Sequence, residues 1–304
     1  MTLRAIPGPC RRSPARFDLA VAWLCVLVAA GPLRAAPARP AALTGDDQIL
    51  WIVVSDWDPE TGRTLNWIAR VDPSSLAVTP LLMPAQLGQV KASATVDGAL
   101  HLFLANEGGS PLKTAHYSFA ITGGDRRELR LPEDALPAAL AGDKAGLWAI
   151  VDGLTAEKVN TAWCKYLEDR RRDELSATSE GESAAREPAN AVESRPFDLQ
   201  ADHPYVVKYD GLVWQPAFAA PPNLTLDGEV WLAVEGEKHH AFWCPAGARD
   251  VSYAVRKGAS WASGPAVSFA RRPARAYAGI LNKQLVFVGL SAGTGGSELH
   301  AEPF

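Results

Sequence analysis

The chain has 304 residues, of which 47% are hydrophobic and 21% charged, and its formal net charge is −4. This composition is typical of a folded globular protein and excludes a largely disordered one. The negative charge argues against nucleic acid as a partner, because nucleic-acid-binding proteins carry an excess of Lys and Arg.

The first 38 residues have the three parts of a secretory signal. Four arginines precede an uncharged apolar run over residues 19–30, and small residues ending in Ala36-Pro37-Ala38 follow it. A membrane-spanning helix needs about 20 apolar residues, so this run is short for one. We therefore predict a signal peptide over residues 1–38 and a secreted or periplasmic protein. The alternative is an uncleaved signal that anchors the chain in a membrane through residues 19–30.

Residues 39–47 are predicted to form an Ala- and Pro-containing linker, and the pattern changes after it. From residue 48 to residue 304, short runs rich in β-branched and aromatic residues alternate with turn residues, which is typical of β-strands. One such turn, Asp97-Gly98, has the composition of a two-residue hairpin. The strands that follow these turns begin at Ile49, Ala99, Leu147, Val230 and Leu285.

One interval between these strands is much longer than the others, and we assign the excess to an insertion over residues 154–204. Its first part, through Leu175, is predicted to be a helix with Val159, Trp163 and Tyr166 on one side. Residues 176–194 are rich in Ser, Glu, Ala and Pro without periodicity, and we expect them to be disordered.

Four antiparallel strands repeated every 40 to 50 residues or so predict an all-β fold, a β-propeller of about 4–5 four-stranded blades. The first unit lacks a clear opening strand and the fifth lacks a clear fourth one. Three alternatives follow: C-terminal strands complete the N-terminal blade and close the ring, the ring is incomplete, or the strands form a sandwich instead. From Gln48 to Phe304 the chain resembles the kelch-like propellers, through Asp97-Gly98, Asp227-Gly228 and the segment from Tyr205 to Trp214.

In such a ring, the loops between second and third strands emerge on one face, where binding usually resides. The candidates for a ligand-binding site on this loop face are Trp57, Asp58, Asn106, Glu107, Glu235 and His239. An aromatic ring there could stack on a sugar, and the carboxylates could hold a cation. The competing interpretation is a set of solvated turns.

His239 and His240 are the only adjacent histidines. Adjacent residues of a strand point to opposite faces, so the two side chains cannot easily share one ion. We predict no metal site and no cofactor. Cys164 and Cys244 are the cysteines that remain after signal removal, and a disulfide between them is an option in an exported protein.

No phosphate-binding loop, nucleophile elbow or zinc-protease motif is present, so the sequence identifies no catalytic residue. The leading hypothesis is an exported, non-enzymatic binding or scaffold module whose ligand is a protein or a carbohydrate. The alternatives are a secreted hydrolase or lyase that acts on a sugar, and a purely structural repeat domain.

Overall fold

The computed structural model describes residues 39–45, 50–58, 63–71, 78–87, 89–96, 98–105, 114–119, 127–128, 131–144, 146–179, 199–268, 275–281, 284–293 and 296–303. The predicted signal peptide over residues 1–38 lies outside these residues. None of the described helices is long and apolar enough to cross a membrane.

The described strands form five antiparallel sheets, each built from consecutive strands of the chain. The first sheet contains β1 (Arg39–Gly45), β2 (Leu50–Asp58), β3 (Arg63–Val71) and β4 (Val78–Leu87). The second contains β5 (Gln89–Val96), β6 (Ala99–Ala105), β7 (Thr114–Phe119) and β8 (Arg127–Glu128). The third contains β9 (Ala139–Asp143), β10 (Gly146–Val151), β11 (Tyr205–Tyr209) and β12 (Trp214–Ala219). The fourth contains β13 (Glu229–Glu235), β14 (Lys238–Cys244), β15 (Asp250–Lys257), β16 (Ser260–Ser263) and β17 (Val267–Ser268). The fifth contains β18 (Arg275–Leu281), β19 (Gln284–Gly293) and β20 (Gly296–Pro303).

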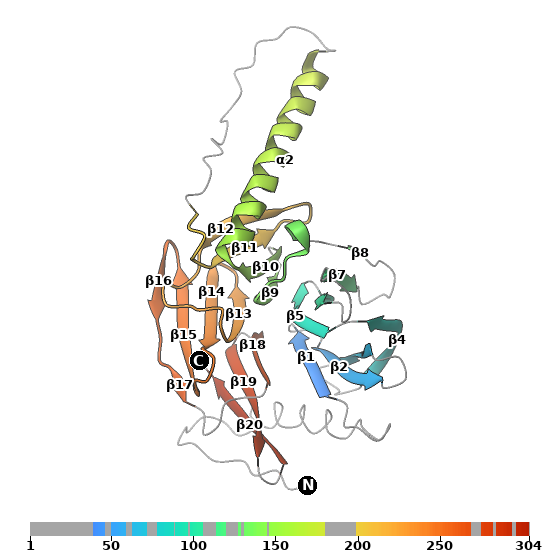
Figure 1. Cartoon of the computed structure of the whole chain (residues 1–304), viewed down its shortest axis with the longest axis vertical. Helices are drawn as coiled ribbons and strands as arrows, with labels where there is room; N and C mark the ends of the chain where they lie inside the picture. Colours follow the sequence, from blue (N-terminus) through green and yellow to red (C-terminus); the bar gives the residue numbers. More distant parts are fainter. Residues whose placement is uncertain are drawn as a thin grey trace.

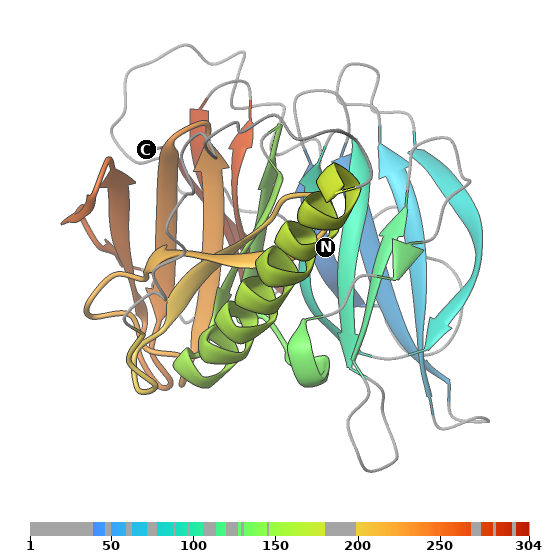
Figure 2. The same cartoon turned by 90° about the horizontal axis from the view of Figure 1, so that it is seen from above.

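The first strands of the five sheets form a closed inner ring (Figures 1 and 2). β1 contacts β5, β5 contacts β9, β9 contacts β13, β13 contacts β18, and β18 contacts β1 again. The described strands therefore form a β-propeller of five blades, which confirms the predicted fold class and agrees with the expected four to five blades. The C-terminal strands form a blade of their own and do not complete the N-terminal one, which has four strands already.

Each blade buries both of its faces against neighbouring blades, and β10 shows how the sequence allows this. Its residues Leu147 to Val151 are all buried. Leu147, Ala149 and Val151 belong to the apolar core between the second and third sheets, while Trp148 and Ile150 belong to the core between the third and fourth. Successive side chains of a strand point to opposite faces, so a continuous apolar run serves two cores at once.

Two predicted boundaries are wrong. Residues Arg39–Gly45, expected to be a linker, form β1 and pair with β2. The strand at Val230 is the first strand of its blade and not the second, since it belongs to β13. Asp227-Gly228 consequently precedes the blade, and the hairpin turn lies at Gly236-Glu237, where Gly236 has a φ of 59°.

The insertion begins with a 27-residue helix, α2 (Gly153–Ser179), which projects from the ring (Figure 1). Ala156 and Val159 anchor its first turns in the core between the second and third sheets. Gly153 is required at its start, because a Cβ atom there would lie 2.4 Å from the carbonyl oxygen of Gln200. Residues 176–179, expected to be disordered, belong to this helix, and residues 180–198 lie outside the described part of the chain.

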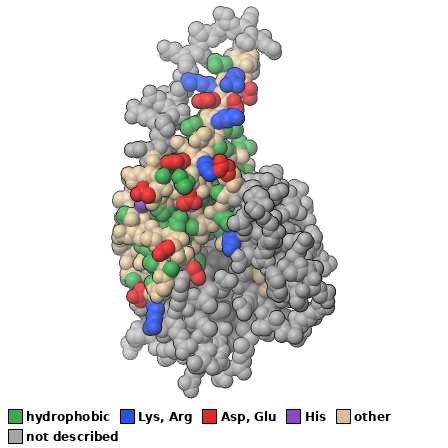
Figure 3. Space-filling view, viewed as in Figure 1, with side chains coloured by type: hydrophobic (Ala, Val, Ile, Leu, Met, Phe, Trp, Pro, Cys, Tyr) green, Lys and Arg blue, Asp and Glu red, His purple; other side chains and the backbone are tan. Residues whose placement is uncertain are grey.

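Beyond its base, α2 is covered by charged side chains of both signs (Figure 3). Arg170 pairs with Glu174 at 3.2 Å and Arg172 with Asp169 at 3.4 Å, with all four side chains mostly exposed. Such pairs contribute little to stability in water. The three consecutive arginines are therefore part of a solvated helix surface.

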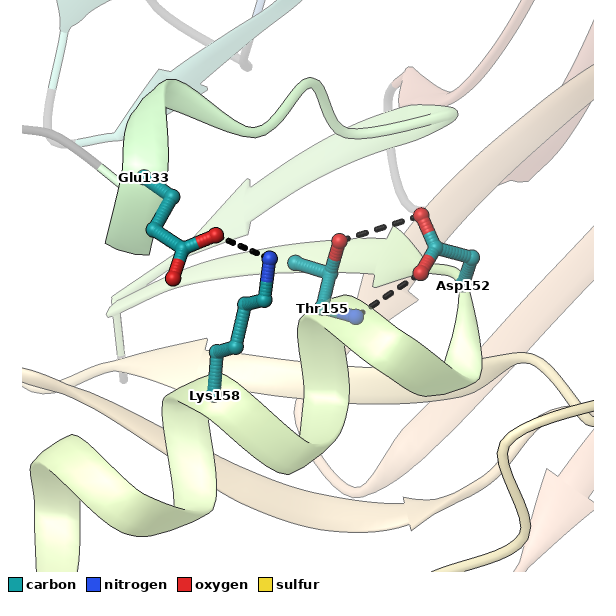
Figure 4. A network of polar contacts seen from close by, with 4 residues as sticks. All are labelled: Glu133, Asp152, Thr155 and Lys158. Atoms are coloured by element: carbon teal, nitrogen blue, oxygen red, sulfur yellow. Dashed lines mark hydrogen bonds and ion pairs between the residues drawn. The ribbon is translucent and has the colours of Figure 1, made fainter.

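Asp152 caps the N-terminus of α2 (Figure 4). One carboxylate oxygen accepts a hydrogen bond from the backbone N–H of Thr155 at 2.7 Å, and the other accepts one from its hydroxyl at 3.0 Å. Nearby, Lys158 pairs with Glu133 of the short helix η2 (Pro132–Asp134), which ties the helix to the ring.

We expect Asp152→Ala to lower the free energy of unfolding by about 1 kcal/mol, because the amide of Thr155 loses its acceptor. Asp152→Asn, which retains a side-chain oxygen, should lose less. Urea denaturation of both variants measures the change, and hydrogen exchange at the Thr155 amide localises it. Equal stability of the wild type and Asp152→Ala would contradict this role of the cap.

Candidate functional site

Two ends of the propeller are defined by its topology. The connections from first to second strands and from third to fourth strands lie at one end, which we call the hairpin face. The connections from second to third strands, including α2, lie at the other end together with the links between blades. The sequence candidates were expected at this second end.

The structure does not bring the six sequence candidates together. Trp57 and Asp58 close β2 at the α2 end, where their backbones pair with Thr64 and Arg63. Asn106 and Glu107 follow β6 and lie outside the described residues. Glu235 and His239 flank the β13–β14 turn and thus lie at the hairpin face, because the fourth blade begins one strand later than the sequence indicated.

His239 and His240 point to opposite sides of the fourth blade, as the strand geometry predicted. The ring of His239 contacts Trp148 and Phe218 of the third blade. His240 stacks on Tyr253 and makes a 2.9 Å hydrogen bond with its hydroxyl through Nδ1. Within the described residues, no group of three or more Cys, His, Asp or Glu side chains is placed to hold a metal ion.

Around His239 the third and fourth blades contribute a polar and aromatic group that we call the interblade cluster. It consists of Asp143, Trp148, Lys208, Phe218, His239 and Arg256. Most of these residues lie near strand ends at the hairpin face: Asp143 ends β9, His239 follows the β13–β14 turn, and Arg256 precedes the β15–β16 turn.

Two aromatic rings enclose the imidazole of His239. Its centroid lies 4.4 Å from that of Trp148 and 4.8 Å from that of Phe218, in both cases with the rings at 76°. This edge-to-face arrangement is favourable for aromatic pairs. His239 is only 4% exposed, and neither of its ring nitrogens has a hydrogen bond of normal geometry to the described residues. Most buried polar groups are paired, so such a group calls for an explanation.

Three charged groups surround this imidazole. Lys208 Nζ lies 4.9 Å from the centre of the Trp148 ring, and the guanidinium carbon of Arg256 lies 3.7 Å from the centre of the Phe218 ring. These are cation–π distances. The indole N–H of Trp148 donates a 3.3 Å hydrogen bond to the carboxylate of Asp143, which fixes the first strand against the second.

The environment keeps His239 neutral at pH 7. Burial lowers the pKa of its imidazole. The nearby backbone of Glu237 raises this pKa in part, although it forms no hydrogen bond of good geometry with the ring. The carboxylate of Asp143 also raises the pKa, whereas the positive charges of Arg256 and Lys208 lower it. A neutral imidazole carries one N–H donor and one free acceptor. The site can therefore accept a proton, donate a hydrogen bond and contact an apolar ring face.

The two cysteines do not form the disulfide that the sequence left open. Neither is part of a disulfide: Cys164 lies on α2 and Cys244 is buried at the end of β14. Cys244 donates a hydrogen bond to the carbonyl of Ala248 at 3.5 Å and packs in the core between the fourth and fifth sheets. The two cysteines belong to separate parts of the fold, the projecting helix and the fourth blade.

Five residues of the interblade cluster were missed by the sequence analysis, which singled out His239 alone. The others are spread from Asp143 to Arg256 on five different strands or their ends, so no local spacing joins them. Trp148 lies in the apolar strand β10 and is buried, so its sequence context does not distinguish it from a core residue. A search for charged residues inside otherwise apolar strands would have marked Lys208 and Arg256.

No protein-family model matches this chain, and no curated protein sequence matches it. Several solved structures match it in fold. A GH43_1 enzyme from Xanthomonas citri matches with a TM-score of 0.47 and 12% identity, over 88% of this chain and 87% of that one. The RS223 β-xylosidase matches with a TM-score of 0.45 and 13% identity, over 88% and 91%. The β-propeller domain of the Trilobed protease from Pyrococcus furiosus matches with a TM-score of 0.40 and 9% identity, over 89% and 69%.

These matches correct the leading functional hypothesis. Two of the three structures are an enzyme of the GH43 group and a β-xylosidase, which goes against a non-enzymatic binding module, and we abandon that hypothesis. Identities of this size transfer no activity or substrate to this chain. What the chain shares with them is the propeller fold.

Proposed function

We propose that this protein is an enzyme that acts on a carbohydrate, as a hydrolase or a lyase, with its active site at the interblade cluster. The observation that carries the proposal is the buried imidazole of His239, whose ring nitrogens are unpaired within the described residues and which lies between aromatic rings near the carboxylate of Asp143. Buried ionisable groups with shifted pKa values concentrate at catalytic sites.

Each part of the cluster has a role in this proposal. His239, neutral at working pH, is the general base. Asp143 is the acidic partner that stabilises the imidazolium formed when His239 takes a proton, since the carboxylate already raises its pKa. Phe218, which is partly exposed and packs on Trp148, provides apolar surface against which a sugar ring can pack. Proton transfer by a positioned side chain accelerates such reactions by about 10²–10⁴-fold.

Export and the kelch-like resemblance also stay proposals. The signal pattern over residues 1–38 supports export, which fits an enzyme whose substrates are extracellular polysaccharides. The turn residue Gly98, which directly precedes β6 and has a φ of 73°, supports the resemblance. N-terminal sequencing of the protein recovered from the periplasm or medium would test export.

The test uses two neighbouring histidines as a matched pair. We expect His239→Asn to lower kcat by about 100-fold or more on any polysaccharide that the wild type cleaves. His240→Asn is the control, because His240 is equally buried, on the same strand, and faces the fifth blade instead. Cleavage is followed as new reducing ends and as the absorbance of unsaturated products, which separates hydrolysis from elimination.

Two results would overturn the proposal. One is the absence of cleavage by the folded wild type across a panel of neutral and acidic polysaccharides. The other is an equal loss of kcat in both histidine variants. That result would mean that substitutions on this strand disturb the structure and that the imidazole of His239 takes no part in the reaction. Thermal unfolding of both variants confirms that each is folded in the assay.

A further inference from the structure

We propose that the interblade cluster recognises the carboxylate of an acidic sugar, with Lys208 and Arg256 as its cationic contacts. This inference rests on the proposed function, since it names the substrate class of the same site. It begins with how the two cations are held. Each lies over an aromatic ring, and neither makes an ion pair with the described residues.

Several other cations of the described surface are held differently. Lys158, Arg170 and Lys238 each pair with a glutamate. Lys208 and Arg256 are only partly exposed, yet they have an aromatic face where those residues have a carboxylate. Rings of this kind orient a cation while leaving its N–H donors available to a ligand.

The local charge favours an anion. Lys208 and Arg256 contribute two positive charges and Asp143 one negative charge, while the buried His239 is neutral, so the cluster carries an excess of one positive charge. The chain as a whole has a formal net charge of −4, so this excess is a local feature. The imidazole supplies a further N–H that can donate to an anionic oxygen, since its nitrogens have no hydrogen bond of normal geometry to the described residues.

The aromatic residues narrow the class of anion. Phe218 is partly exposed and packs on the buried Trp148 beside the cations, so the ligand should carry both an apolar face and a single charge. A sugar ring with one carboxylate has both, whereas inorganic phosphate has neither an apolar face nor a matching single charge. Trp261 extends the aromatic surface, because its ring lies 6.0 Å from that of Phe218 and its N–H is bonded to the carbonyl of Ala219.

The experiment compares substrates that differ only in charge. The probes are oligomers of galacturonate and the same oligomers with methyl-esterified carboxyl groups, and binding to the full-length protein is measured by calorimetry. We expect the wild type to bind the acid at least 10-fold more tightly than the ester. Arg256→Gln and Lys208→Gln should each lower affinity for the acid by about 10-fold or more, as expected for a lost hydrogen bond to a charged group, and leave affinity for the ester unchanged.

Lys257→Gln is the control, because Lys257 adjoins Arg256 at the end of β15 but points away into solvent. Equal binding of acid and ester, or an equal effect of Lys257→Gln, would overturn the inference. Tighter binding of a sulfated sugar than of the galacturonate oligomer would overturn the choice of carboxylate as the anion.

The outcomes separate this inference from the proposed function. Cleavage of neutral polysaccharides with no preference for the acid would leave the enzyme proposal standing and reject the acidic substrate. Charge-dependent binding that requires Lys208 and Arg256, without any cleavage, would support the anion site and reject the enzyme. Absence of both binding and cleavage would reject both.

Discussion

Trp51→Ala is expected to lower the free energy of unfolding by about 3–5 kcal/mol, the largest effect of any single substitution considered for the described part of the ring. Trp51 lies on β2 and is completely buried. Its indole N–H donates a 3.0 Å hydrogen bond to the carbonyl of Gly98, 47 residues further along the chain in the second blade. Truncation therefore creates a large cavity and removes a polar link between the first two blades.

The position of Trp51 makes this loss more than a local one. The first and second blades meet along β1 and β5, where the hydroxyls of Thr44 and Thr95 also lie 3.2 Å apart. Since the ring is closed, a weakened junction between two blades affects the fit of all five. Trp51→Phe, which keeps most of the ring but not the hydrogen bond, should cost less than Trp51→Ala.

Urea denaturation gives the free energies needed for this comparison. Trp163→Ala is the control, because Trp163 lies on α2 outside the ring and is only partly buried, so its removal should cost far less. A free energy of unfolding for Trp51→Ala within about 1 kcal/mol of the wild type would show that the blade junction tolerates the cavity. In that case the packing at Trp51 would not hold the two blades together.

The propeller fold could be predicted from the sequence because the repeat has strong local signals, although these left the number of blades at four or five. Runs such as Leu147–Val151 are apolar on both faces, and turns such as Asp210-Gly211 have a clear chemistry. In the structure the carboxylate of Asp210 accepts hydrogen bonds from the backbones of Leu212 and Val213, both at 3.0 Å, and Gly211 has a φ of 98°. These features depend on neighbouring residues only, so a single sequence contains them.

The position of the fourth blade could not be predicted in the same way. Asp227-Gly228 has the composition of a hairpin turn, but Gly228 is needed for close packing: a Cβ there would lie 2.0 Å from the carbonyl oxygen of Cys244. A tight turn and a close approach of two backbones both require glycine, and the sequence does not distinguish these two requirements. Likewise, Arg39–Gly45 forms a strand because of its pairing with β2 and its contacts with β5 and β18, not because of its own composition.

The candidate site was hidden for a related reason. Its six residues lie on several strands of two blades, and they meet only because the third and fourth sheets pack face to face. The adjacent histidines suggested a possible shared metal ion, but their side chains point to opposite faces of the strand, so each packs toward a different neighbouring blade. What makes His239 a candidate is its packing against Trp148 and Phe218, which no spacing along the chain indicates.

Acid is expected to destabilise the propeller well above the pH at which its buried histidines protonate in the folded state. Burial lowers the pKa of His101 and of His240 to about 4, whereas the ordinary value in an unfolded chain is about 6.5. Burial also lowers the pKa of His239. Between the two values the unfolded chain binds protons that the folded chain does not, so unfolding becomes easier as the pH falls.

The contribution of these histidines is fully present above pH 6.5 and is lost progressively as the pH falls toward 4. The slope is at most about 1.4 kcal/mol per pH unit for each histidine, and lower where solvent shields the charge. For His240 the nearby charges are Glu235, which raises its pKa, and Lys238 and Lys257, which lower it, so burial decides the direction.

The melting temperature measured between pH 7 and pH 4.5 tests this, at about 2–4 °C per kcal/mol for a domain of this size. His240→Asn should flatten the dependence, because an amide does not titrate and removes one of the protons taken up on unfolding. Carboxylates also contribute to acid unfolding, but they are common to the wild type and the variant, so the difference between the two curves isolates the histidine. Parallel curves would mean that His240 titrates alike in the folded and unfolded chain, and its burial against Tyr253 would then have no energetic consequence.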